Sequence, residues 1–445
     1  MSTCVKPLTA KALDSIRQTG YLNVWEGSVR ASKTVASELA WIHYIVNSPD
    51  QVFIMSGRTQ ASLYRNVIGG DFGLLAMLGS LATFREEREG SRVLIVRGTR
   101  HGTPFEKTCY CFGASDASSH AALRGLTAGG WYADEVNMQA KSFVEEAFRR
   151  TIVSTDRKHF WTLNPGNPLE YIYTDYLDRY QEQQLPGFHL WHFTLDDNLA
   201  LTEARKAELR AQYSGLFYRR YILGERCLAE GIIYDMLTEE NFYDDTTRPQ
   251  GLPYLATRYI SIDYGTTNPC VFLDIYDDGT TIWIDREYYF DSHKAQRQKD
   301  DSEYADDFEA FIGDQPDHPP AAVVVDPSAA SFILTLKHRG YLVKPAVNDV
   351  LYGIRILSTL FKHRTVKIHT TQCPNTCAEL QVYAWDDKAV VHTGKEAPLK
   401  IKDHSADSIR YWCATILPKW RLEMGAETTT VVAGPRAIVQ QFRAR

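Results

Sequence analysis

Residues 21–55, YLNVWEGSVRASKTVASELAWIHYIVNSPDQVFIM, contain one complete strand–loop–helix–strand pattern. The segment begins and ends with short apolar runs typical of buried strands, at residues 21–25 and 51–55. Between these runs, apolar residues recur every three or four positions, as on one face of a helix, at Val35, Leu39, Ile42 and Val46. A helix between two strands joins them in parallel, so the segment predicts a parallel sheet covered by helices.

Further apolar runs continue this pattern toward residue 195. They are the candidate strands 93–96, 108–112, 130–133 and 160–163. The next 60 or so residues are mixed, because a helical segment near 202–213 is followed by the breakers Arg248-Pro249 and Gly251. We therefore predict an α/β domain over 1–195 and a linker or small subdomain over 196–255.

The second half begins with strands instead of a strand–helix alternation. Residues 258–263, 269–276 and 281–290 read as an antiparallel meander, whose last turn is Asp277-Asp278-Gly279. A helix near 303–312 and a buried strand at 321–325 follow. This order predicts a mixed sheet with helices on its faces over 256–424, and the small polar residues of 425–445 predict a mobile tail.

The composition is that of a globular protein with large cores. The chain has 445 residues, is 44% hydrophobic and carries a net charge of −6, which excludes a disordered chain and a uniformly basic coat. The N-terminus lacks the apolar core of a secretion signal, and no apolar run is long enough to span a membrane. Eight cysteines are too sparse for a disulfide framework, which favours a reduced, cytoplasmic protein. Zinc binding by Cys373, Cys377 and His369 is an alternative to buried thiols, and we favour buried thiols.

The loop after the first strand, Gly27–Thr34, resembles the phosphate-binding pattern G-x-x-x-x-G-K-[ST], with Ser32 in place of the second glycine. In such a loop Lys33 reaches the β- and γ-phosphates and Thr34 ligates magnesium. A polar turn with a helix cap is the alternative. The strand before the loop and the amphipathic helix after it favour phosphate binding.

Two further strand ends carry polar groups suited to the same site. Trp131–Glu135 is an apolar strand that ends in two acids, and we expect Asp134 to hold magnesium and Glu135 to polarise the attacking water. The alternative is a solvated turn. Thr162 and Asn164 end the next strand and are candidates for sensing hydrolysis, although Asn-Pro-Gly is also ordinary turn chemistry.

A second acidic site is predicted in the other domain. Asp263 and Asp326 each follow a buried strand, and His404 and Asp407 share one face of a late helix. Three acids from separate elements are what a two-metal phosphodiesterase requires. We expect Asp403 to cap that helix rather than bind metal. We expect solvent-facing or turn positions for Asp274, Asp277 and Asp278.

Taken together, these motifs resemble the large terminase subunit of tailed bacteriophages, from about Tyr21 to Tyr411. The segments that carry the resemblance are Gly27–Thr34, Trp131–Glu135, Thr162–Pro165, Asp263–Gly265, Asp326-Pro327 and His404–Asp407, with Val347–Asp349, Gly353-Ile354, Cys377–Leu380 and Tyr383. The resemblance implies an N-terminal P-loop ATPase domain with a parallel sheet and a C-terminal nuclease domain similar to ribonuclease H.

The resemblance also implies roles for single residues. Lys33 and Thr34 would bind ATP and Mg²⁺ within the loop that includes Gly27 and Ser32, while Asp134 would assist the metal and Glu135 act as catalytic base. Thr162 and Asn164 resemble the motif that couples hydrolysis to DNA movement. Arg30 or Arg124 would supply the arginine that neutralises transition-state charge, and we prefer Arg124 because its loop could reach a neighbouring subunit. Asp263, Asp326 and Asp407 resemble the nuclease metal ligands for Mg²⁺ or Mn²⁺, with His404 as an auxiliary.

The implied partners are double-stranded DNA, a portal protein, a small terminase subunit and further copies in a ring on the procapsid, in the host cytoplasm and away from any membrane. A helicase-nuclease of repair or recombination and a non-catalytic nucleotide-binding scaffold are the alternatives. Two basic clusters are candidate DNA contacts or merely solvated faces. They are Arg149, Arg150, Arg157 and Lys158, and Arg355, Lys362, His363 and Arg364.

Overall fold

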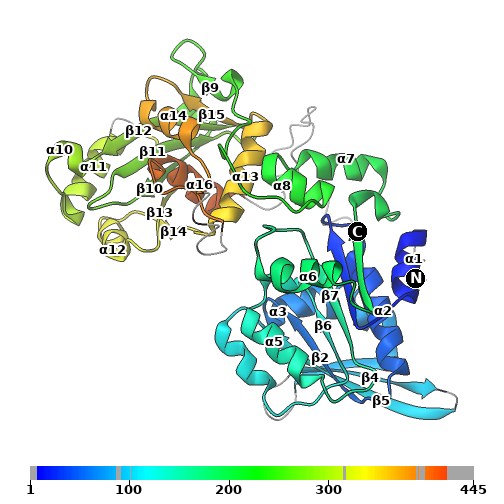
Figure 1. Cartoon of the computed structure of the whole chain (residues 1–445). Coiled ribbons are helices and arrows are strands. Elements are labelled where there is room, and N and C mark those ends of the chain that lie inside the picture. The colour runs from blue at the N-terminus through cyan, green and yellow to red at the C-terminus, as the bar shows by residue number, and fades with distance from the viewer. Residues whose placement is uncertain are drawn as a thin grey trace, which may run out of the picture. The chain divides into compact units, whose positions relative to one another are not determined.

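The computed structural model describes residues 8–86, 92–100, 102–313, 317–386, 389 and 396–417 (Figure 1). These residues divide into two compact units. Unit 1 contains the described residues up to 206 together with 215–231 and those of 385–397, and unit 2 contains 207–214, 232–384 and those from 398 onward. The expected linker, 196–255, is thus shared between the units, and the expected tail, 425–445, lies outside the described residues.

Unit 1 is built on an eight-stranded sheet in the order β3-β4-β5-β2-β6-β7-β1-β8. Its strands are β1 (Leu22–Gly27), β2 (Val52–Gly57), β3 (Ala82–Glu86), β4 (Arg92–Arg100), β5 (Thr103–Gly113), β6 (Gly130–Ala133), β7 (Lys158–Leu163) and β8 (Phe188–Phe193). Six neighbouring strands of this order, β5-β2-β6-β7-β1-β8, pair in parallel, as predicted. The prediction of a purely parallel sheet was wrong at one edge, because β3 and β4 pair antiparallel with each other and β4 pairs antiparallel with β5.

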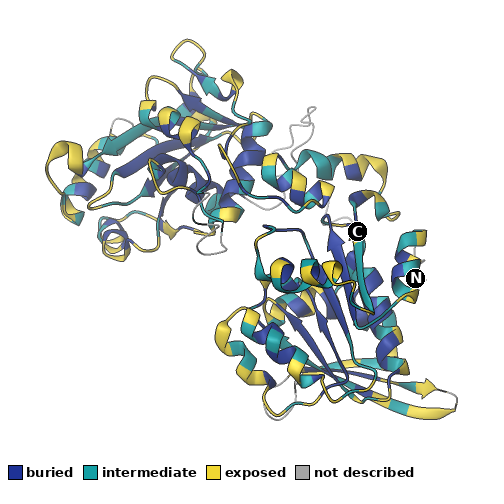
Figure 2. Ribbon diagram, in the orientation of Figure 1, coloured by how far each residue is buried: buried dark blue, intermediate teal, exposed yellow. Residues whose placement is uncertain are grey.

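Helices cover both faces of this sheet, so its central strands are buried on both sides (Figures 1 and 2). On one face, α2 (Lys33–Asn47) packs Trp41 and Tyr44 against Trp25 of β1 and Phe160 of β7. On the other face, α5 (Lys141–Arg150) packs against Val24 and its neighbours. Alternate β1 residues therefore enter opposite cores, which explains the nearly continuous apolar run in the sequence.

Unit 1 also contains several smaller helices. They are α1 (Ala10–Arg17), α3 (Gln60–Leu63), α4 (Leu74–Leu78), α6 (Asp178–Glu182) and α8 (Gly215–Tyr218), while α7 (Glu203–Ala211) runs across the boundary of the two units in sequence.

Glu396, from late in the chain, joins unit 1 through a buried ion pair with Arg220. The side chains of Arg220 and Glu396 are 6% and 5% exposed, and the guanidinium binds both carboxylate oxygens. Glu396 also accepts a hydrogen bond of 3.2 Å from the Ala229 amide. Residues 176 positions apart in the chain thus belong to one core.

Unit 2 is built on a seven-stranded mixed sheet in the order β14-β13-β10-β11-β12-β15-β9. Its strands are β9 (Phe242–Tyr243), β10 (Thr257–Asp263), β11 (Cys270–Asp277), β12 (Ile282–Phe290), β13 (Ala322–Val325), β14 (Val343–Pro345) and β15 (Val366–His369). As predicted, β10, β11 and β12 form an antiparallel meander, and Gly279 takes a φ of +94° in its last turn. The remaining neighbours pair in parallel.

Helices also cover both faces of the second sheet (Figure 1). The described helices of unit 2 are α9 (Leu252–Leu255), α10 (Ser292–Ala295), α11 (Asp301–Gly313), α12 (Ala330–His338), α13 (Val350–Lys362), α14 (Pro374–Val382) and α16 (His404–Ile416). Ile260 and Ile262 of β10 enter the core under α11 and α12. Ser261, between them, donates a 2.6 Å hydrogen bond to the Ser408 carbonyl of α16, so α16 lies on the opposite face.

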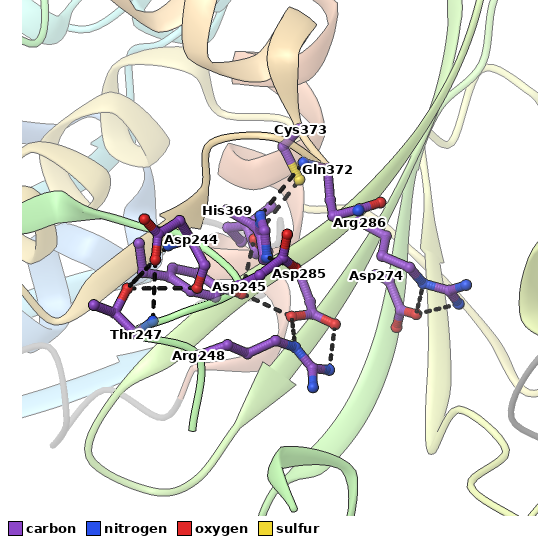
Figure 3. A network of polar contacts seen from close by, with 12 residues as sticks. Asp244, Asp245, Thr247, Arg248, Asp274, Asp285, Arg286, His369, Gln372 and Cys373 are labelled. Carbon is purple, nitrogen blue, oxygen red and sulfur yellow. Dashed lines mark hydrogen bonds and ion pairs between the residues drawn. The ribbon is translucent and has the colours of Figure 1, made fainter. Parts of the chain in front are cut away.

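Asp274 corrects one prediction, because it is fully buried instead of facing solvent. Its carboxylate accepts two hydrogen bonds of 2.8 Å from Arg258 and one of 2.8 Å from Arg286, while Arg248 makes a similar bidentate pair with Asp285 (Figure 3). A buried carboxylate needs such partners to offset its lost hydration. The acid in this strand is therefore structural.

The cysteines in the described part of the chain are all free thiols, and Cys373 is buried while Cys377 is half-buried. Burial raises the pKa of both thiols, which keeps them protonated. Within the described residues no group of three or more His, Cys, Asp or Glu side chains is placed to hold a metal ion. No described helix combines the length and apolarity needed to cross a bilayer.

Candidate phosphate-binding and acidic sites

The phosphate-binding loop connects β1 to α2, as the sequence pattern predicts. Gly27 has no room for a side chain, since an added Cβ would lie 1.8 Å from the Phe193 carbonyl oxygen. The next two amides anchor the loop, with Ser28 N–H donating to Phe193 O (2.9 Å) and Val29 N–H to Tyr221 O (2.8 Å). The start of the loop is therefore fixed by both β8 and the 219–223 segment.

Ser32 takes the backbone conformation that explains the glycine of the usual motif. Its φ is +68° and its ψ is 14°, in the left-handed region, immediately before the first turn of α2. A residue with a Cβ is strained in this conformation. Serine here therefore lowers the free energy of unfolding by about 1 kcal/mol. The serine changes the stability of the loop and leaves its path intact.

Replacing Ser32 with glycine is expected to stabilise the protein by about 0.5–1 kcal/mol, because glycine adopts this φ without strain but loses more backbone entropy on folding. Urea unfolding followed by tryptophan fluorescence measures the change. Ser32→Ala is the matched control, since alanine removes the hydroxyl but retains the Cβ and should give no gain. Equal stability of the glycine and alanine variants would show that Ser32 is not strained.

Lys33 lies buried at the base of the loop. Its Nζ donates to the carbonyls of Gly27 (2.9 Å) and Ser28 (2.5 Å) and to Asn164 Oδ1 (2.9 Å). Burial lowers the pKa of Lys33 to about 7, although Asp134, Glu135 and Glu26 oppose this shift. Thr34 follows on the first turn of α2 and is half-buried. The ammonium is thus held at the end of the sheet among acids.

The two predicted acids follow β6 directly. Asp134 Oδ1 accepts from Thr162 Oγ1 (2.8 Å) and Oδ2 from Asn66 Nδ2 (3.0 Å). Burial raises the pKa of Asp134, and burial together with the Asp134 charge raises the pKa of Glu135. Glu135 also has a left-handed φ of +49°, a strained conformation that often marks a functional residue.

The end of β7 brings both halves of this site together. Thr162 binds the Asp134 carboxylate and accepts from the Glu135 amide (3.2 Å), while Asn164 binds Lys33. This follows from the strand order, because β7 lies between β6 and β1 and parallel strands end at the same edge. The structure thus places the residues predicted to sense hydrolysis against the predicted lysine and acid.

The two candidate arginines are both exposed. Arg30 has a φ of +56°, and its carbonyl accepts from Asn198. Arg124 ends the 3-10 segment 117–123, with Nη2 3.4 Å from His120 Nε2. In the part of the chain that the structure describes, no hydrogen bond or ion pair joins either guanidinium to Lys33 or the acids. The choice between them stays a prediction.

Sequence reasoning missed three residues around the acids. Asn66 binds Asp134 directly, and the Arg58 charge counteracts the rise in the pKa of Glu135. Glu38 of α2 is 1% exposed, neither of its carboxylate oxygens is hydrogen-bonded to a described residue, and burial raises its pKa to about 10. Arg58 follows β2, so its position after a parallel strand was a usable signal, whereas Asn66 depends on a tertiary contact.

In unit 2, the ends of two adjacent strands position the first two acids of the second site. β10 and β13 pair in parallel with Ile262 opposite Val325, so Asp263 and Asp326 are the next residues of neighbouring strands. Asp263 Oδ2 lies 2.9 Å from Nδ1 of His404, the first residue of α16. Burial raises the pKa of Asp263 to about 6, and the nearby charge of Asp407 acts in the same direction.

Asp407 lies in the first turn of α16 and has several partners. Its Oδ1 is 3.1 Å from Arg410 Nη2 and 3.3 Å from the Tyr383 hydroxyl, and its Oδ2 is 3.1 Å from Lys400 Nζ. Asp403 occupies the N-cap position, but its side chain pairs with Lys400 at 2.9 Å and caps no amide. The predicted capping role of the Asp403 side chain was therefore wrong, since a nearby ammonium binds it instead.

Asp326 completes the predicted set. Ser328 N–H donates to its Oδ1 (2.8 Å) and the Tyr411 hydroxyl to its Oδ2 (2.7 Å), and these bonds with the Arg410 charge lower its pKa against the effect of burial. The charges of Asp263, Asp407 and Asp326 all raise the pKa of Tyr411, in addition to burial. The three acids therefore all act on the same phenol through their charge, and Asp326 also binds its hydroxyl.

The donor set suits a hard divalent cation, since it offers carboxylate oxygens and one imidazole. In the described residues, however, no three His, Cys, Asp or Glu side chains already enclose a metal position. The Asp407 oxygens are bound instead by Lys400 and Arg410. Asp263 lies beside Asp326 in the strand register and contacts His404, and a cation would compete with Lys400 and Arg410 for the Asp407 oxygens.

Many members of the predicted basic clusters make internal contacts. Arg149 and Arg150 pair with Glu146, and Arg157 lies over the Tyr21 ring. In the second cluster, Lys362 donates to the Tyr213 carbonyl, His363 contacts the Ala211 carbonyl and Arg364 pairs with Glu240. These basic side chains therefore have partners within the protein, and their contacts need no bound DNA to explain them.

The comparisons with known proteins agree with this architecture. The family model described as "Terminase large subunit, T4likevirus-type, N-terminal" matches residues 31–240. A crystal structure of the large terminase from a thermophilic bacteriophage is 34% identical, covering 92% of this chain and 99% of that one with a TM-score of 0.79. Structures of that terminase in complex with ADP and with ATP-γ-S give TM-scores of 0.77 and 0.76 at 34% and 33% identity, with the same coverage. The comparison with curated proteins gave no match.

Proposed function

The chain belongs to the large terminase subunits of tailed bacteriophages, the ATPase and nuclease of phage DNA packaging, and on this basis we propose that it drives duplex DNA into a procapsid and cuts concatemeric DNA. The observation that carries the proposal is the similarity to the thermophilic-phage large terminase, which extends over both candidate sites. An ATPase alone would need only the first site.

The first site would bind and hydrolyse ATP with its magnesium ion. The Lys33 ammonium would neutralise the β- and γ-phosphates and the Thr34 hydroxyl would ligate Mg²⁺. Asp134, held by two hydrogen bonds, would orient the hydrated metal, and Glu135 would accept the proton of the attacking water. The elevated pKa of Glu135 makes its carboxylate a better base than a solvated one.

Coupling to DNA movement would begin at the end of β7. Asn164 binds the Lys33 ammonium and Thr162 binds Asp134, so loss of the γ-phosphate changes the partners of both at once. Arg124, which is exposed and contacts His120, suits a finger offered to a neighbouring copy in a ring. Arg30 remains the alternative within the same loop.

The second site would cut DNA. Asp263, Asp326, Asp407 and His404 would hold Mg²⁺ or Mn²⁺, which when bound polarises the scissile phosphate and activates water. His404 and Asp263 already contact each other, and the imidazole hydrogen bond fixes the direction of that carboxylate. Binding along the DNA would rely on phosphate contacts and be nearly independent of sequence.

The proposed partners are a portal protein, a small terminase subunit and further copies of this chain, assembled in the host cytoplasm. The test combines the purified chain with portal-bearing procapsids, the small subunit, linear duplex DNA and ATP, and measures DNA protected from DNase. We expect protection only with ATP and procapsids present. Strand separation of a forked duplex by the chain alone, without protection, would favour a helicase-nuclease instead.

A further inference from the structure

The carboxylate of Asp326 is held at both oxygens, although the residue is only half-buried at the end of β13. The Ser328 amide fixes Oδ1 at 2.8 Å. Oδ2 receives a 2.7 Å bond from the Tyr411 hydroxyl and a much longer contact of 3.4 Å from Asn348 Nδ2. Hydrogen bonds weaken steeply with length, so Tyr411 is the stronger of the two restraints on Oδ2.

The position of Tyr411 on α16 lets its hydroxyl reach the Asp326 carboxylate. It lies four residues after Asp407, one helical turn away on the same face, and is 2% exposed. The Arg410 guanidinium lies 4.8 Å from the centre of its ring. The helix that supplies Asp407 therefore also determines how Asp326, from a separate strand, is oriented.

We infer that Tyr411 is a positioning residue for DNA cleavage, whose hydroxyl holds Asp326 in the orientation that binds the divalent cation. The inference rests on the proposed nuclease site and assigns a residue that ligates nothing itself. Groups that hydrogen-bond a metal ligand commonly change metal affinity by about 10- to 100-fold when removed. An ionised carboxylate offers about four lone-pair sites, so the three contacts to Asp326 leave it able to bind the cation as well.

The test measures Mn²⁺ binding to the full chain without nucleotide, by electron paramagnetic resonance of the free ion. Tyr411→Phe removes only the hydroxyl and is expected to raise the Mn²⁺ dissociation constant about tenfold. The melting temperature in EDTA should stay close to that of the wild type. Tyr288→Phe is the matched control, because that hydroxyl donates to Asp307 of α11, and its Mn²⁺ affinity should not change.

A double-mutant cycle separates orientation from packing. If Tyr411 acts through Asp326, adding Tyr411→Phe to Asp326→Asn should weaken Mn²⁺ binding no further. A further loss in the double variant, or wild-type affinity in Tyr411→Phe, would overturn the inference while leaving the nuclease site standing. Wild-type Mn²⁺ affinity in Asp326→Asn alone would instead overturn the site and the inference together.

Discussion

Lys33→Ala is expected to lower ATP turnover by about 1,000-fold and leave metal-dependent plasmid cleavage unchanged. The ammonium sits between two loop carbonyls and Asn164, where the phosphates of a bound nucleotide would meet it. Alanine removes the loop charge that these contacts fix in position, and the nuclease acids belong to the other unit. Phosphate release and plasmid nicking, measured on one preparation, check both halves of the expectation.

Lys107→Ala is the matched control for that variant. Lys107 is also a buried lysine of unit 1, and its ammonium donates to the Ser48 and Asp50 carbonyls. Its loss removes comparable contacts far from the loop in sequence, so turnover per folded molecule should persist. Equal loss in both variants would mean that Lys33 contributes stability rather than catalysis.

Asp326→Ala is expected to have the opposite effect to Lys33→Ala. DNA cleavage should fall by at least about 100-fold, and ATP turnover should be retained. Asp326 lies beside Asp263 in the strand register, and its Oδ2 is bound by Tyr411, one helical turn after Asp407 on α16. Removal of one carboxylate leaves the cation with too few hard ligands. Plasmid nicking with Mg²⁺ and with Mn²⁺ measures the loss.

Asp307→Ala provides the comparison for Asp326→Ala in the same unit. Asp307 likewise accepts a tyrosine hydroxyl, from Tyr288, and it pairs with Lys299. Because it belongs to α11 and not to the acidic site, its replacement should preserve cleavage. Intact cleavage in Asp326→Ala would refute the nuclease assignment.

Local patterns were enough to predict much of the fold. The predicted strand 130–133 coincides with β6, and the helix expected between Val35 and Val46 lies within α2. These elements are buried on one or both faces, so their apolar spacing is a direct record of packing. The edge strands β3 and β8 have a weaker apolar pattern, because their side chains are only partly buried.

Residues that act through tertiary contacts could not be predicted in this way. Asp274 stands in the apolar run of β11, and only the strand register reveals Arg286 opposite it. Asn66 and Tyr411 support Asp134 and Asp326 from elements distant in the chain. A single sequence shows how apolar and polar residues are spaced within one helix or strand. It does not show which residues of two different elements lie opposite each other. The acids could therefore be predicted, and the groups that orient them could not.

The ion pair between Arg220 and Glu396 bears on how the gene can recombine. A crossover near residue 231 that brought in a downstream sequence without an acid at position 396 would leave the buried guanidinium without its counter-ion. Such an unpaired buried charge costs about 3–5 kcal/mol, a large part of what keeps a domain folded. Hybrid phages should therefore inherit the two halves of this gene together, or exchange the second half in a piece that retains an acid at position 396.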